Sequence, residues 1–137
     1  MHIDVDLSGK VAIVTGGGRG IGRAIALAYG RAGASVIVAA RTVAEITAVA
    51  DQIVAAGGDA LPVSVDVAGP DAERACVATT LEARGRIDVV VANAGVGGFH
   101  AEGDRVEAFR RVVDVNLVGA YALVDAARDA LCRQGGK

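Results

Sequence analysis

A glycine-rich turn constrains the fold of this chain more than any other feature. Residues 15–22 read TGGGRGIG, and they follow the apolar run at residues 11–14. Directly after the turn, apolar residues recur with the period of a helix, starting at Ile21. A strand, a glycine turn and a helix in this order bring backbone N–H groups and the positive end of the helix close to a phosphate, because no Cβ intervenes. The sequence therefore predicts an anion-binding turn at the start of a βα unit.

Apolar runs alternate with helix-period segments along the rest of the chain. Four runs are expected to be strands, at residues 10–15, 35–40, 60–65 and 87–92. Helical patterns follow each of them, and the last continues from about residue 105 to residue 133. This alternation predicts βαβ units and an α/β fold with a parallel sheet. Because the 137 residues contain no linker or repeat, we expect one domain over residues 1–137.

Local motifs predict the ends of the first two helices. Gly33 is expected to end the first helix in a left-handed conformation. Thr42 and Glu45 have the spacing of a capping box, in which each side chain would satisfy a free N–H group at the start of the second helix, for about 1 kcal/mol. The side of the first helix that faces the sheet is expected to carry Ile21, Ala24, Ile25, Ala28 and Tyr29.

Composition and charge exclude several classes of function. The chain has 14 basic and 16 acidic residues, 3% aromatic residues and no basic block, so nucleic-acid binding has little support. No apolar run is long enough to cross a membrane, and the N-terminal residues do not have the pattern of a signal peptide. No cluster of residues has metal-ligand spacing. Cys76 and Cys132 are expected to be buried free thiols in a soluble, cytoplasmic protein.

Four motifs follow one another along the chain: Thr15-Gly16-x-x-x-Gly20-x-Gly22, Asp66-Val67, Asn93-Ala94-Gly95 and Asp114-Val115-Asn116-Leu117-Val118-Gly119. In this order they resemble the motifs of the short-chain dehydrogenase/reductase family in its single-domain form. The resemblance extends over essentially the whole chain, and 3-oxoacyl-carrier-protein reductases look similar to it. It implies a Rossmann-like, doubly wound sheet with the strand order 3-2-1-4, here incomplete because the later strands are missing.

The resemblance assigns roles to the glycine turn. Gly16 would permit the tight turn, Gly20 would let a phosphate approach, and Gly22 would let the helix pack on the sheet. An ordinary glycine-rich loop is the alternative interpretation. The coenzyme-binding residues of the turn are expected to be Gly16, Gly18, Arg19, Gly20, Ile21 and Gly22.

Two further motifs are expected to contact the coenzyme, as the resemblance implies. Asp66, which Val67 follows, would bond the amino group of adenine; a turn-forming aspartate is the alternative. Asn93 would stabilise the centre of the sheet through bonds from its side chain to the backbone. Ala94 and Gly95 would let the coenzyme lie close to the chain.

The last motif supplies one residue of the family's Asn-Ser-Tyr-Lys tetrad. Asn116 is expected to hold a water of the proton relay, and Val115 to pack near the adenine. Asparagine is unfavourable inside a helix, so we also expect a local break there. The alternative is a solvated or locally bonded asparagine.

Charge at the end of the second strand predicts the coenzyme. Dehydrogenases that prefer NAD place an acid there, which accepts from the ribose hydroxyls. Here Ala40 and then Arg41 stand at that point, and Arg19 lies within the glycine turn. Guanidinium groups bind a 2′-phosphate through charge-assisted hydrogen bonds. The pair predicts NADP, with NAD possible; two solvated surface arginines are the alternative.

A tyrosine followed four residues later by lysine is the family's proton donor, and this chain does not contain that pair. Tyr29 is followed at that spacing by Gly33, and Tyr121 by Asp125. We therefore expect the chain to be the N-terminal, coenzyme-binding half of an oxidoreductase and to be inactive alone. The parent reaction would be hydride transfer between the nicotinamide and a carbonyl or secondary alcohol.

A non-catalytic dinucleotide-binding or assembly module is the alternative function. In either case the fourth strand would be an unpaired, apolar edge of the sheet, which invites association. The long last helix would also expose apolar area. We expect a homo-oligomer or an unstable monomer.

Overall fold

The computed structural model describes residues 5–66, 69, 71–97 and 103–133. Its centre is a parallel sheet with the order β3-β2-β1-β4, as predicted. The strands are β1 (Val11–Thr15), β2 (Ser35–Ala40), β3 (Asp59–Ser64) and β4 (Val89–Val91). The fourth is shorter than the predicted run, and it lies at one edge of the sheet, beside β1. The Rossmann-like α/β class is therefore confirmed.

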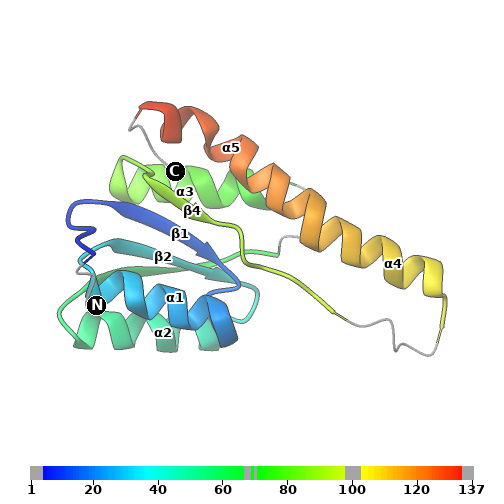
Figure 1. Ribbon diagram of the computed structural model, residues 1–137, viewed down its shortest axis with the longest axis horizontal. Coiled ribbons are helices and arrows are strands. Elements are labelled where there is room, and N and C mark those ends of the chain that lie inside the picture. The colour runs from blue at the N-terminus through cyan, green and yellow to red at the C-terminus, as the bar shows by residue number, and fades with distance from the viewer. Residues whose placement is uncertain (1–4, 67–68, 70, 98–102, 134–137) are drawn as a thin grey trace.

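Helices cover both faces of the sheet (Figure 1). The helices α1 (Gly20–Arg31) and α2 (Val43–Ala55) lie on one face, and α3 (Ala72–Arg84) and α5 (Gly119–Arg133) lie on the other. Neighbouring strand residues alternate between the two cores, so that Ile13 packs with the α3 and α5 side while Val14 packs with the α1 and α2 side. Strands buried on both faces explain why the sequence shows continuous apolar runs.

Small residues, and not the predicted apolar ones, form the buried side of α1. Gly22, Ala26 and Gly30 are buried at intervals of four residues. Of the predicted set, Ile21, Ala24 and Ala28 are exposed, and Ile25 and Tyr29 are half-buried. A Cβ on Gly30 would lie 2.7 Å from Cγ2 of Ile53 in α2. The helix therefore packs closely through its smallest residues, and the predicted face was wrong for three positions.

The predicted helix ends were right for Gly33 and wrong for the capping box. Gly33 has φ +91°, and its N–H donates to the Gly30 carbonyl at 3.1 Å, which is a left-handed helix end. Thr42 is the N-cap residue of α2, but its side chain makes no capping bond. The box fails because the Glu45 side chain lies instead against Gly18 of the glycine turn.

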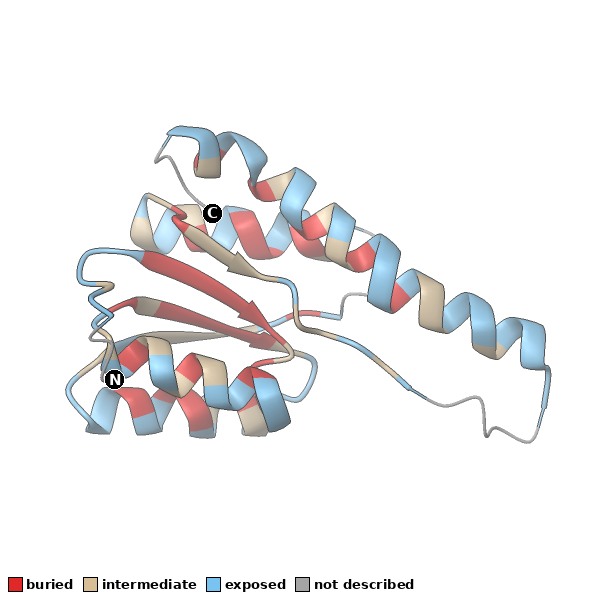
Figure 2. Ribbon diagram, viewed as in Figure 1, coloured by how far each residue is buried: buried red, intermediate tan, exposed pale blue. Residues whose placement is uncertain are grey.

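The long C-terminal helix is interrupted at one point. It consists of α4 (Arg105–Val113), a π-helical turn η1 (Asp114–Val118) and α5. The predicted break at Asn116 is therefore confirmed, since Asn116 lies inside the π-helical turn. No residue of α4 is buried, and this helix extends beyond the sheet (Figures 1 and 2). No helix in the described ranges is both long and apolar enough to span a bilayer.

The two cysteines differ in their surroundings. Cys76 in α3 is buried, and burial raises the pKa of its thiol to about 11. Cys132 is exposed near the end of α5, so the prediction of two buried thiols was wrong for this residue. The inward face of α5 is formed by Leu123, Ala127 and Ala130, which leaves Cys132 outside the core. Both thiols are free, as predicted.

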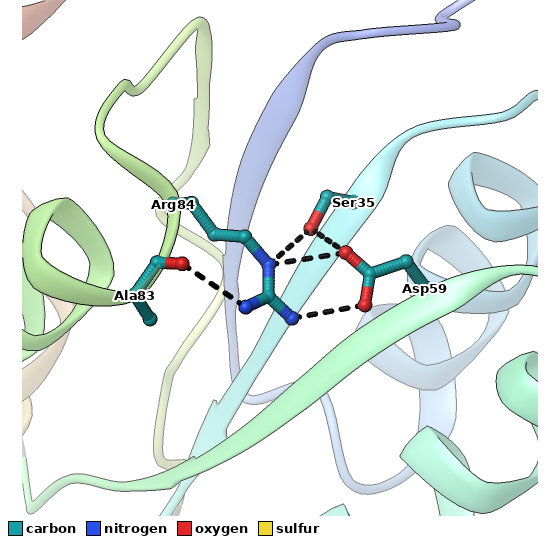
Figure 3. A network of polar contacts seen from close by, with 4 residues as sticks. All are labelled: Ser35, Asp59, Ala83 and Arg84. Carbon is teal, nitrogen blue, oxygen red and sulfur yellow. Dashed lines mark hydrogen bonds and ion pairs between the residues drawn. The ribbon is translucent and has the colours of Figure 1, made fainter.

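Two charge clusters lie at the edge where the strands begin. Figure 3 shows the guanidinium of Arg84, the last residue of α3, facing both Ser35 of β2 and Asp59 of β3. Its Nη2 donates to Oδ1 of Asp59 at 2.9 Å, and its Nε donates to Oγ of Ser35 at 2.8 Å. These bonds connect α3 to β2 and β3.

The second cluster surrounds the buried carboxylate of Asp88, just before β4. Arg86 donates to both of its oxygens, at 2.8 and 2.6 Å, and the N–H of Val11 donates to Oδ2 at 2.9 Å. The bonds from Arg86 hold the pKa of Asp88 below its ordinary value, against the opposing effect of burial. Asp88 therefore remains charged and joins β4 to the start of β1.

Candidate functional site

A cavity of about 600 Å³ lies where the strands end. Ligands of open parallel α/β sheets bind at this edge, beyond the carboxyl ends of the strands. The predicted residues that line it are Gly16, Gly18, Arg19, Gly20, Ile21, Arg41, Asp66, Asn93, Ala94, Gly95 and Val115. Gly22 and Asn116 do not line this strand-end cavity, and Val67 lies outside the described residues. The volume is in the range of small-molecule and coenzyme sites.

The glycine turn forms one wall of the strand-end cavity. Gly16 and Gly20 have φ values of +64° and +55°, which residues with a side chain rarely adopt. A Cβ on Gly22 would collide with the carbonyl oxygen of Gly16 and lie 2.5 Å from Nδ2 of Asn93. The turn therefore packs directly on the start of α1, and only glycine fits at that contact.

The N-terminus of α1 is open to a ligand. Its N-cap residue, Arg19, makes no capping bond through its side chain, and the first turn contains no acidic residue. The first N–H groups of a helix have no partner within the helix. Their partial positive charge attracts an anion at this position.

Thr15 and Asn93 join the ends of β1 and β4 beneath the cavity. Nδ2 of Asn93 donates to the Thr15 carbonyl at 3.0 Å, the kind of side-chain-to-backbone bond that the sequence predicted. Oγ1 of Thr15 accepts from the N–H groups of Asn93 and Ala94, each at 3.1 Å. These bonds fix the backbone of residues 93–95 beside the glycine turn.

Asn116 supports the loop after β4. Its Oδ1 accepts from the Val96 N–H at 2.8 Å, and its Nδ2 donates to the Val96 carbonyl at 3.0 Å. The side chain thus binds both backbone groups of a residue twenty positions away. Val115, its neighbour in η1, is buried and reaches the cavity. The proton-relay role of Asn116 remains a prediction.

Charged side chains of both signs line the strand-end cavity. Arg19 and Arg41 are exposed, and no ion pair engages either of them within the part of the chain that the structure describes. Glu45 and Asp66 contribute carboxylates to the same lining. The open glycine backbone, the helix N-terminus and the two guanidinium groups together fit a ligand with several phosphates.

The sequence did not identify several residues that line the cavity: Thr15, Ala39, Ala40, Thr42, Glu45, Val65 and Val96. Most of them end a parallel strand or follow it closely. That position alone could have indicated them, because carboxyl ends of parallel strands meet at one edge of the sheet. Glu45 is different, since it lies on the first turn of α2.

Known proteins match this chain in sequence and in structure. Versicolorin reductase 1 of Aspergillus parasiticus is 43% identical over 137 residues, which cover 96% of this chain and 50% of that protein. A short-chain type dehydrogenase/reductase from Mycobacterium marinum superposes with a TM-score of 0.87 at 43% identity, covering 95% of this chain and 53% of the other. A metagenomic short-chain oxidoreductase in complex with NADP superposes with a TM-score of 0.87 at 42% identity, covering 95% of this chain and 60% of the other.

The chain spans about half the length of the curated relatives that it matches over almost all of its own length. The family model described as short chain dehydrogenase matches residues 10–137, which include the glycine turn, all four strands and Asn116. The superpositions show that the solved relatives share the fold of this chain. The chain belongs to the short-chain dehydrogenase family.

Proposed function

We propose that this chain is the coenzyme-binding part of an NADP-dependent oxidoreductase. Its reaction is hydride transfer between the nicotinamide and a carbonyl or secondary alcohol. The observation that carries the proposal is that a glycine turn at an uncapped helix and two guanidinium groups face one cavity. A relative of similar fold was solved with NADP, which supports the choice of coenzyme.

The residues of this chain bind and orient the coenzyme. Backbone N–H groups of the glycine turn and of α1 hold the pyrophosphate, and the helix dipole stabilises its charge. Arg19 and Arg41 hold the 2′-phosphate. Asp66, Asn93, Ala94 and Gly95 line the same cavity, where they would contact the adenosine part of the coenzyme. The coenzyme, when bound, supplies or accepts the hydride.

Asn116 acts on the reaction through position. By holding both backbone groups of Val96, it fixes the loop that follows β4 beside the cavity. No tyrosine of the 137 residues is followed four positions later by lysine, so we expect these residues to bind coenzyme without turning over a carbonyl substrate. The likeness to 3-oxoacyl-carrier-protein reductases stays a prediction.

The exposed apolar face of α4 to α5 supports self-association. Phe109, Leu117 and Tyr121 are 54%, 66% and 72% exposed, and they recur along one side of this long helix. β4 also lies at an edge of the described sheet. We expect a homo-oligomer in the cytoplasm, where the free thiols of Cys76 and Cys132 stay reduced. Light scattering that shows only monomer at high concentration would contradict the association.

Fluorescence titration with NADPH and with NADH tests the coenzyme. We expect saturable binding of both, with NADPH tighter by about fivefold or more, because only NADPH presents a 2′-phosphate to the arginines. Equal affinities would contradict the NADP preference. Failure of both coenzymes to bind would contradict the proposed function itself.

A further inference from the structure

Glu45 lies in the strand-end cavity, although its sequence motif predicts a helix-capping role. The N-cap of α2 has no side-chain capping bond. The Glu45 side chain lies instead against the glycine turn: a Cβ built on Gly18 would be 2.9 Å from Cβ of Glu45 and 3.2 Å from its Oε2. Because Gly18 has no side chain, the carboxylate occupies this part of the cavity wall.

The charge of Glu45 is not neutralised by the arginines of the cavity. Arg19 and Arg41 line the same space, yet no ion pair found among the described residues joins either of them to Glu45. An anion bound in this cavity meets two guanidinium groups that attract it, and the carboxylates of Glu45 and Asp66 in the same lining repel it. Repulsion between like charges disfavours binding of a more highly charged ligand.

We propose that Glu45 determines coenzyme selectivity by opposing the 2′-phosphate. The inference rests on the function proposed above. Arg19 and Arg41 favour NADP, while Glu45 reduces that preference and so keeps NAD as a usable coenzyme. A coenzyme without the 2′-phosphate carries less negative charge at this end and is repelled less. Removing the carboxylate charge therefore strengthens NADP binding more than NAD binding.

A purely structural role of Glu45 makes a different prediction. As the acidic residue in the first turn of α2, Glu45 interacts favourably with the helix dipole. Loss of that interaction lowers the stability of the fold, and it weakens both coenzymes alike. The ratio of the two dissociation constants separates the roles, because a general loss of stability leaves the ratio unchanged.

The test compares Glu45→Gln with the unsubstituted 137-residue chain by calorimetric titration of NADP and of NAD at low salt. We expect the preference for NADP to increase by about threefold or more, chiefly through a smaller dissociation constant for NADP. Asp51→Asn is the matched control: it makes the same change of charge on an exposed position of α2, outside the cavity lining. In this control the ratio stays the same.

The inference is overturned if Glu45→Gln changes the ratio of the two dissociation constants by less than about threefold, or shifts the preference toward NAD. The proposed function stands in either case. The inference is also overturned if Asp51→Asn shifts the ratio as much as Glu45→Gln does. A parent chain that binds neither coenzyme overturns the proposed function, and this inference with it.

Discussion

In the part of the chain that the structure describes, arginine side chains are paired with carboxylates at one end of the sheet and not at the other. Where the strands begin, Arg84 and Arg86 are bound to carboxylates through paired hydrogen bonds, and each cluster joins separate elements. Where the strands end, Arg19 and Arg41 line a cavity and make no ion pair within the described residues. The same residue type therefore stabilises the fold at one end and is available to a ligand at the other.

This difference has a physical basis. A bound guanidinium has its hydrogen bonds satisfied, so it adds to the stability of the folded state and has little to offer an anion. An open guanidinium contributes little to stability and retains its donors for a phosphate. Substitutions at the two ends should therefore separate stability from coenzyme binding.

Gly22→Ala should have the largest effect, because Gly22 supports both the stability of the fold and the binding of coenzyme. Its Cβ would collide with the Gly16 carbonyl and approach Nδ2 of Asn93. We expect a loss of about 3 kcal/mol in the free energy of unfolding, with coenzyme binding abolished as the turn is displaced. Denaturant unfolding and NADPH titration measure the two. Gly97→Ala, where the new Cβ meets no atom within 4 Å, should change neither.

Asp88→Asn should lower stability and leave coenzyme binding intact. The substitution removes the charge that Arg86 and the Val11 N–H share, for a loss of about 2 kcal/mol in the free energy of unfolding. Asp129→Asn, at an exposed site on α5, is the control and should have little effect. A weakened affinity for NADPH in Asp88→Asn would break the separation between the two ends.

The lowered pKa of Asp88 also predicts that the stability of the fold depends on pH. The folded state lowers the pKa of Asp88 through its bonds with Arg86, so the folded protein binds fewer protons than the unfolded chain near that pKa. Its stabilisation is complete above the unfolded pKa of about 3.9 and is lost as the pH falls through the lower folded value. Unfolding curves of the unsubstituted chain between about pH 6 and pH 2 should show this loss, and Asp88→Asn should have a shallower slope.

Arg41→Ala should weaken NADP binding at almost no cost in stability. We expect the dissociation constant of NADP to rise by about tenfold, that of NAD to change by less than about twofold, and the free energy of unfolding to stay within about 0.5 kcal/mol. Arg31→Ala, at an exposed residue outside the cavity, provides the matched loss of charge. Equal weakening of both coenzymes would remove Arg41 from the 2′-phosphate site.

Arg84→Ala should have the smallest effect and should act on stability alone. The Arg84 pair is partly exposed, so we expect a loss of about 1 kcal/mol in the free energy of unfolding and unchanged binding of NADPH. Arg74→Ala breaks an ion pair with Asp71 in which both side chains are exposed, and it should cost less than about 0.5 kcal/mol. Similar losses in the two variants would show that the bonds to Ser35 and Asp59 add nothing.

Local pattern in the sequence determined the frame of the protein. The run at residues 35–40 predicted the bounds of β2, and Gly33 predicted the end of the first helix. The glycine turn predicted the wall of the cavity. These features depend on neighbouring residues in the chain: side-chain periodicity, the need for a positive φ, and the absence of a Cβ.

Only the tertiary structure decided which side chains meet across elements. Periodicity indicated Ile21 and Ala24 for the buried face of α1, but close packing against Ile53 requires a small residue at Gly30. Close packing against Gly16 and Asn93 does the same at Gly22. The capping motif predicted that the Glu45 side chain bonds the start of its own helix. In the structure this side chain lies against Gly18 in the cavity wall, where the glycine leaves room because it has no Cβ. In both cases the outcome depends on the distance between two helices or between a helix and a turn. That distance is set by the packing of the whole core, which no local pattern contains.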